Sequence, residues 1–288
     1  MKSATAWQAG YTIVETMIFL IISSVLLLSV IGMFSGRTQR TQFTQSVQGL
    51  ATRITTTSNE VSTGTYPEIP SFDCTNNGGV PHLSTSAATV NQGSRDGCIF
   101  IGKIMNFTVN PNCTDIATDS CDNTDIYTVV GVRELDTISH TVVTTLSGAK
   151  PKMVTNPVNL TSNFRLANGT RVTGAYLRDS SGTLTLISAV GFFQGFGGSY
   201  SSDGNLSSGS QSLGVWYLKP SISPIAPRSD SDISTMLDTN RVYSLGSAEG
   251  IVVCLQSGNR DQRSSIGIGD ANGALTTNVT AGDSRCAS

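Results

Sequence analysis

The feature that most constrains this chain is residues 11–34, YTIVETMIFLIISSVLLLSVIGMF, an apolar run with one charged residue, Glu15. A helix rises about 1.5 Å per residue, so the run reaches about 36 Å and can cross a hydrocarbon layer of about 30 Å. A charged side chain at mid-bilayer costs about 2.5 to 3.5 kcal/mol, and less near an end of the span. The run therefore predicts a membrane-spanning helix in which Glu15 needs either a partner or hydration at the interface.

A short leader, MKSATAWQAG, precedes the apolar run, and Lys2 is its only charge. A secretory signal peptide has a shorter apolar core followed by a small-residue cleavage site, whereas this run is long and is followed by SGRTQR. Processing is therefore expected before the run, not after it. Lys2 at one end and Arg37 and Arg40 at the other leave the membrane orientation undecided by charge.

Beyond Phe34, apolar residues continue at helical spacing through residues 35–62. They are Phe43, Val47, Leu50, Ile54 and Val61. This stripe predicts one helix from Thr12 to about Ser62, about 75 Å long, whose second half is an amphipathic stem that packs on the rest of the protein. Gly64 and Pro67 are expected to end it.

Gly32 and Gly36 lie near the outer end of the apolar run. Each costs a helix about 1 kcal/mol relative to alanine, so the two glycines predict a weak point in the helix. Small residues also allow two helices to pack closely, and this second interpretation stays open.

All six cysteines follow the apolar run: Cys74, Cys98, Cys113, Cys121, Cys254 and Cys286. An even number on one side of a membrane span indicates an oxidising compartment, which places residues 63–288 outside the cytoplasm. We favour pairing in sequence order: the first with the second, the third with the fourth, the fifth with the sixth. Zinc is not expected, because no CxxC occurs and His82 and His140 stand alone.

Residues 63–288 contain short alternating or apolar segments between turn signals, which predicts a β-rich head. Strands are expected at 98–109, 125–135, 140–147, 171–178, 183–194, 213–219, 241–246, 249–256 and 263–269. The Gly- and Ser-rich residues 195–214 predict a mobile loop, and residues 220–238 a surface connection. The expected fold class is α+β: a long N-terminal helix packed on a mainly antiparallel sheet with long loops.

The chain contains no GxSxG, Walker or HExxH motif, so neither catalysis nor a cofactor is expected. Four aspartates surround the third and fourth cysteines: Asp115, Asp119, Asp122 and Asp125. They are weak calcium candidates without EF-hand spacing, and a solvated acidic loop is the alternative. Phe192, Phe193, Phe196 and Tyr200 form either an adhesive patch or part of the core at a strand end.

The stem and the head carry charge of opposite sign. Residues 35–62 carry a net charge of +2, whereas residues 63–288 hold 14 basic and 18 acidic residues. The acidic head argues against bulk binding of nucleic acid, although a local basic patch at Arg260 and Arg263 stays open.

The segment AGYTIVE resembles the processing site of type IV prepilins and type II secretion pseudopilins. In this sequence Gly10 ends a short positive leader, Tyr11 is the aromatic first mature residue, where phenylalanine is usual, and Glu15 is the fifth residue after the cut. The resemblance covers about residues 1–62. It implies that a prepilin peptidase cuts after Gly10 and N-methylates Tyr11, and that Glu15 pairs with the freed amine of a neighbouring Tyr11 in a filament.

The resemblance also implies a type IV pilin-like fold with four parts: a leader (1–10), a transmembrane and filament-core helix (11–34), a stem helix (35–62) and an extracellular head (63–288). The segment EGIVVCLQSGNRDQRSSIGIGDANG is similar to the final hairpin of H-type minor pseudopilins, and the loop between Cys254 and Cys286 resembles the disulfide-bounded region of pilins. The length of the chain leans toward a minor pilin. In an assembled filament the helix would unwind near Gly32 and Gly36.

The implied location is the cytoplasmic membrane before assembly, with the head outside, and a filament on the cell surface afterwards. The implied partners are other pilin subunits, the prepilin peptidase and a pilus or secretion assembly platform. Glu15 implies a position below the extreme tip of the filament, or positions throughout it. Two alternatives stay open: a pseudopilin of a secretion machine, and a single-pass anchored binding ectodomain that never assembles.

Overall fold

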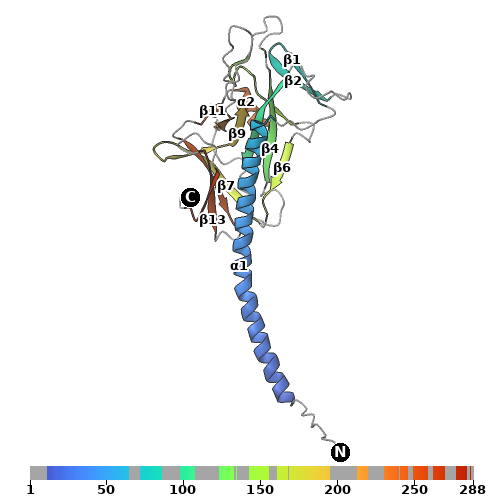
Figure 1. Cartoon of the computed structure of the whole chain (residues 1–288), viewed down its shortest axis with the longest axis vertical. Helices are drawn as coiled ribbons and strands as arrows, with labels where there is room; N and C mark the ends of the chain where they lie inside the picture. Colours follow the sequence, from blue (N-terminus) through green and yellow to red (C-terminus); the bar gives the residue numbers. More distant parts are fainter. Residues whose placement is uncertain are drawn as a thin grey trace, which may run out of the picture.

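The structure is a computed structural model that describes residues 12–64, 72–85, 98–107, 123–132, 134, 143–155, 161–167, 169–194, 213–219, 230–239, 241–245, 249–258, 262–269, 277–283 and 286. Within these ranges one long helix projects from a β-rich head (Figure 1). The expected α+β class and the N-terminal helix are confirmed.

The long helix, α1 (Ile13–Ser62), is continuous over 50 residues. Thr12 caps its N-terminus, since the amide of Glu15 donates to Thr12 Oγ1 at 3.3 Å. The helix ends where Gly64 takes a positive φ of 64°, a conformation in which glycine meets no steric penalty. The predicted span of Thr12 to about Ser62 therefore agrees with the structure.

Among the described residues, the strands form two sheets and a separate hairpin in which every pair is antiparallel. The seven-stranded sheet has the order β11 (Val242–Ser244), β10 (Leu213–Leu218), β9 (Ala189–Gln194), β3 (Ile99–Phe107), β4 (Asn123–Gly131), β5 (Lys152–Val154), and β6 (Thr161–Arg165) also pairs with β4. The five-stranded sheet has the order β14 (Thr277–Ala281), β13 (Arg263–Ile268), β12 (Gly250–Gln256), β7 (Arg171–Arg178), β8 (Leu184–Ile187). The hairpin is β1 (Phe72–Asn77) with β2 (Val80–Thr85).

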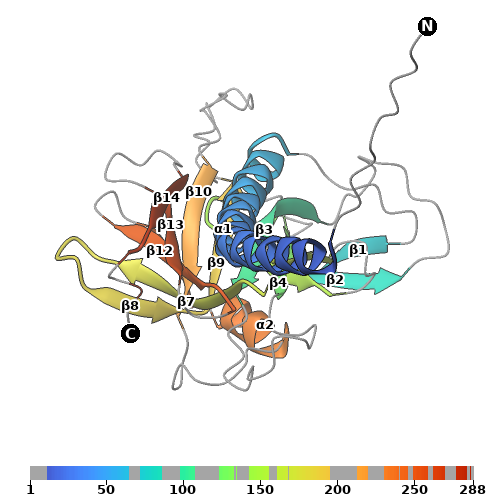
Figure 2. The same ribbon diagram turned by 90° about the horizontal axis from the view of Figure 1, so that it is seen from below.

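The stem half of α1 packs its apolar side against both sheets, and its polar side faces outward (Figure 2). Its predicted apolar stripe is buried, and no member is more than 6% exposed. The stripe shares one core with Met105 and Phe192 of the seven-stranded sheet and with Val253 and Ile266 of the five-stranded sheet. The helix is therefore part of the core and not a separate stalk.

The predicted strand 183–194 is wrong in one respect, because it is two strands in two different sheets. β8 ends at Ile187 in the five-stranded sheet, and β9 begins at Ala189 in the seven-stranded sheet. At Ser188, which is buried, the backbone amide donates to the carbonyl of Leu218 at 2.8 Å. Apolar side chains continue through the corner, so the sequence pattern shows no break there.

Two further predictions are wrong. Of the expected strand at 140–147, the described residues 143–147 form no strand, and the chain bends and turns at 145–149; Val143 and Leu146 are both buried, at a spacing of three. Residues 230–238 of the predicted surface connection form α2 (Asp230–Asp238), which packs on the seven-stranded sheet opposite α1 through Ile233, Met236 and Leu237. Their i, i+3, i+4 spacing is a helix signal that sequence reasoning overlooked.

Two of the favoured disulfides are present. Cys74 of β1 bonds to Cys98, directly before β3, and Cys254 of β12 bonds to Cys286 near the chain end. The first attaches the β1–β2 hairpin to the seven-stranded sheet, and the second holds the C-terminus on the outer face of the five-stranded sheet. Cys113 and Cys121 lie outside the described residues, as do residues 195–212 of the predicted loop.

Candidate functional site

The first turn of α1 contains Glu15, the one residue of the Gly10, Tyr11 and Glu15 set that lies within the described residues. Thr12 and Glu15 have the spacing of a capping box, T-x-x-E, in which the Thr hydroxyl accepts from the backbone of the third helical residue. A carboxylate in the first turn is also favoured by the helix dipole. Glu15 therefore has a local role in starting the helix, which its spacing from Thr12 could have predicted.

The first half of α1 is a fully exposed apolar surface. Residues Ile13–Val30 have a mean hydropathy of 2.4, and none is buried by the rest of the protein. At about 1.5 Å per residue this window spans about 27 Å, so the helix is long and apolar enough to cross a membrane. Hydroxyl groups of Thr16, Ser24 and Ser29 donate to carbonyls three or four residues earlier, which satisfies them without water.

The backbone of α1 is helical through Gly32 and Gly36. In this single chain neither glycine interrupts the helix, and the predicted unwinding concerns an assembled state.

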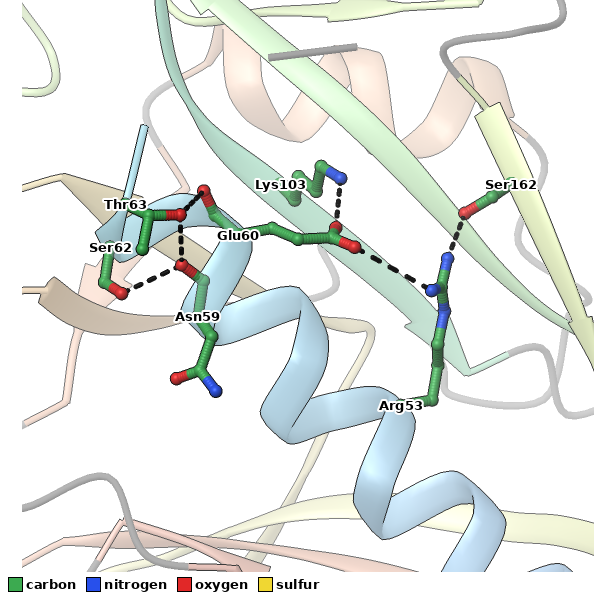
Figure 3. Close-up of polar contacts among 7 residues, drawn as sticks. All are labelled: Arg53, Asn59, Glu60, Ser62, Thr63, Lys103 and Ser162. Atoms are coloured by element: carbon green, nitrogen blue, oxygen red, sulfur yellow. Dashed lines mark hydrogen bonds and ion pairs between the residues drawn. The ribbon is translucent and has the colours of Figure 1, made fainter. Parts of the chain in front are cut away.

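The end of α1 is fixed to the head by a cluster of polar side chains, the stem clamp, shown in Figure 3. Lys103 of β3 donates through Nζ to Glu60 Oε2, and Arg53 Nη1 lies 4.0 Å from Glu60 Oε1. Arg53 also donates through Nη2 to Ser162 Oγ of β6 at 2.9 Å. The Lys103 side chain is only 11% exposed, so its charge depends on Glu60 for compensation.

The stem clamp was not predicted, because Glu60, Lys103 and Ser162 lie on segments far apart in the sequence. A further contact joins α1 to β9, where Gln194 Nε2 donates to the carbonyl of Val61 at 3.0 Å. These bonds hold the end of α1 against the seven-stranded sheet and determine the direction in which its exposed half leaves the head.

Of the four calcium candidates, Asp115, Asp119 and Asp122 lie outside the described residues. Asp125 lies on β4, and its carboxylate accepts from Asn163 Nδ2 at 2.6 Å. The described part of the chain contains no group of three or more His, Cys, Asp or Glu side chains that could hold a metal ion.

Phe192 and Phe193 are fully buried on opposite faces of β9, so these two belong to the core and not to an adhesive patch. Exposed aromatic surface occurs instead at Tyr243, which is 43% exposed and stacks on Tyr217 with ring centroids 5.7 Å apart. Lys219 Nζ lies 5.5 and 5.3 Å from the two centroids. The pKa of Tyr217 is raised, mainly by burial and to a smaller extent by the Glu249 carboxylate and by Tyr243.

Comparison of the chain with protein-family models, with curated proteins and with solved structures gave no match.

Proposed function

We propose that this chain is a structural subunit, a minor pilin, of a type IV pilus-like filament. In this proposal a prepilin peptidase cuts after Gly10, residues 11–34 hold the protein in the cytoplasmic membrane, and the same helix later packs into the filament core. The head is then exposed for surface adhesion, motility or DNA uptake. The proposal assigns no catalytic activity and no cofactor to the chain.

The observation that carries the proposal is the division of one continuous helix into two halves. The stem half buries its apolar stripe against both sheets, whereas residues 13–30 are apolar and are not covered by the rest of the protein. Exposed apolar surface of this extent must be covered by lipid or by other proteins. A subunit that moves from a membrane into a helix bundle covers the same surface in both states and leaves its head unchanged.

The first test is mass spectrometry of the mature N-terminus in the native host. Cleavage after Gly10 and a methylated Tyr11 are expected. A terminus at Met1, or beyond residue 30, contradicts the proposal, and an uncut leader favours the single-pass anchored ectodomain instead.

The second test separates the two roles of Glu15. The bond from the amide of residue 15 to Thr12 Oγ1 is made by the backbone and persists in any variant. Glutamine also serves at the third position of a capping box, so Glu15→Gln removes the charge and keeps a side chain that can reach back to the Thr12 amide, whereas Glu15→Ala removes both the charge and that side chain. If Glu15 pairs with the amine of a neighbouring Tyr11, both variants reduce the amount of filament by about tenfold or more, because an unpaired buried charge is costly.

Comparison of the two variants distinguishes the two roles of Glu15, the helix cap and the intermolecular ion pair. Normal assembly of Glu15→Gln with failure of Glu15→Ala shows that Glu15 acts only as a helix cap, and the intermolecular pair is then wrong. Membrane fractionation provides the control, since both variants should still insert.

A further inference from the structure

A groove lies where α1 enters the head, between the helix and the edge of the five-stranded sheet. We call it the basal groove; its volume is about 490 Å³, and its lining includes Arg40, Phe43 and Val47 of α1, Arg263 of β13 and Val279 of β14. β13 lies at the end of the head from which the exposed half of α1 emerges (Figure 1). The basal groove is therefore at the base of the head, next to the membrane-spanning part.

The groove combines apolar and cationic surface. Phe43 and Val47 are buried and form an apolar floor, and Val279, which is 44% exposed, adds an apolar wall. The side chains of Arg40 and Arg263 are exposed. Within the described part of the chain neither guanidinium has an ion-pair or hydrogen-bond partner, because both ion pairs found there involve Glu60.

The distance along the helix places this groove at the level of lipid headgroups. Arg40 follows Phe34, the last residue of the apolar run, by about 9 Å at about 1.5 Å per residue. The polar region on each side of a bilayer is about 5 to 8 Å thick, and a long arginine side chain extends toward it. Arg40 can therefore reach a lipid phosphate when residues 11–34 lie in the hydrocarbon.

We propose that the basal groove binds one anionic phospholipid before the subunit leaves the membrane. The phosphate lies between Arg40 and Arg263, and the acyl chains remain in the hydrocarbon, on the side of residues 11–34. Guanidinium groups bind phosphate oxygens through paired hydrogen bonds, and two exposed guanidinium groups that line one groove at the level of the headgroups match the charge of one anionic headgroup. The inference rests on the membrane insertion in the proposed function and not on filament assembly.

The test uses the full chain purified in detergent and measured by native mass spectrometry with equimolar phosphatidylglycerol and phosphatidylcholine. Retention of one phosphatidylglycerol in preference to phosphatidylcholine is expected. Each arginine near an anionic headgroup contributes about fivefold in affinity, so Arg40→Gln and Arg263→Gln should each weaken binding about fivefold, and the double variant roughly 25-fold.

Two control variants make the test specific. Arg241→Gln removes the same charge outside the groove and should leave the preference unchanged, and the double lysine variant should recover much of it. Both groove arginines are exposed, so thermal unfolding of the variants should match that of the unaltered protein.

Several results would overturn the inference. These are equal retention of the two lipids, an unchanged preference in the double glutamine variant, and displacement of the lipid by an equal concentration of inorganic phosphate, which would indicate a free-phosphate site. If the unaltered protein shows no lipid preference but forms a dimer that the double glutamine variant loses, the groove holds a second copy of the chain. Cleavage after Gly10 and membrane fractionation of the same variants report on the proposed function independently.

Discussion

At the scale of single residues, Gly102 and Gly49 should respond in opposite ways to substitution by alanine, because their surroundings differ. Gly102 follows a bulge in β3, and a Cβ there would lie 2.1 Å from the carbonyl oxygen of Phe192. Gly49 lies inside α1, and a Cβ there would meet only a ring carbon of Phe164 at 3.7 Å. The first glycine allows two strands to approach, whereas the second has no such role.

These contacts predict opposite effects of the same substitution. Gly102→Ala should destabilise the head by about 1 to 3 kcal/mol or more, because the clash is with backbone. Gly49→Ala should stabilise it by about 0.5 to 1 kcal/mol through helix propensity. Thermal unfolding of the two variants in parallel measures both, and an unaltered melting temperature for Gly102→Ala would contradict the described strand spacing.

At the scale of elements, the stem clamp determines how α1 joins the head. The apolar stripe buries one face of the helix against both sheets, but such contacts tolerate sliding, whereas the bonds of Glu60 to Lys103 and of Arg53 to Ser162 have one geometry. The direction of the exposed half of α1 relative to the head therefore depends on a few polar contacts near its C-terminal end.

Substitutions in the stem clamp should lower the free energy of unfolding by amounts that depend on the residue removed. Glu60→Gln should destabilise the head by about 1 to 2 kcal/mol, since Lys103 is mostly buried and loses its counter-charge. Arg53→Gln should cost less than about 1 kcal/mol, because Arg53 is 27% exposed and lies 4.0 Å from the carboxylate.

A double-mutant cycle in urea unfolding measures these couplings. The double variant Glu60→Gln/Lys103→Met should recover most of the loss from Glu60→Gln alone, because no uncompensated charge remains. Equal costs for Glu60→Gln and Arg53→Gln would contradict the central place of the Lys103 pair.

At the scale of the whole molecule, the head and the exposed apolar half of α1 are separate in their packing. Residues Ile13–Val30 contribute nothing to the core, whereas every apolar residue of the stem stripe is buried. The stability of the head should therefore be independent of residues 1–34.

A chain that begins at residue 35 tests this separation. It should be soluble without detergent and should melt within a few degrees of the full chain, because the core and the described disulfides are retained. Size-exclusion chromatography and circular dichroism measure both properties. Aggregation or a large loss of melting temperature would show that the first half of α1 takes part in the fold of the head.

The local sequence pattern predicted an element correctly where the burial of that element follows from its own periodicity. The stripe from Phe43 to Val61 predicted the stem of α1. The predicted strand 171–178 has the bounds of β7, and the predicted strand 249–256 begins one residue before β12. The favoured pairing of cysteines in sequence order agrees with the two described disulfides. The helix and the strands depend on residues whose burial follows a period of 3.6 or 2.

The sequence by itself determined the apolar span, the stem stripe and the β-rich character of the head, because these follow from local periodicity. Only the tertiary structure decided which strands share a sheet, where Ser188 carries the chain from one sheet to the other, and that α2 covers the far face. It also brought Glu60 to Lys103 and placed Arg40 and Arg263 along one groove. Such pairs join distant segments, and their contacts depend on packing that no window of sequence contains.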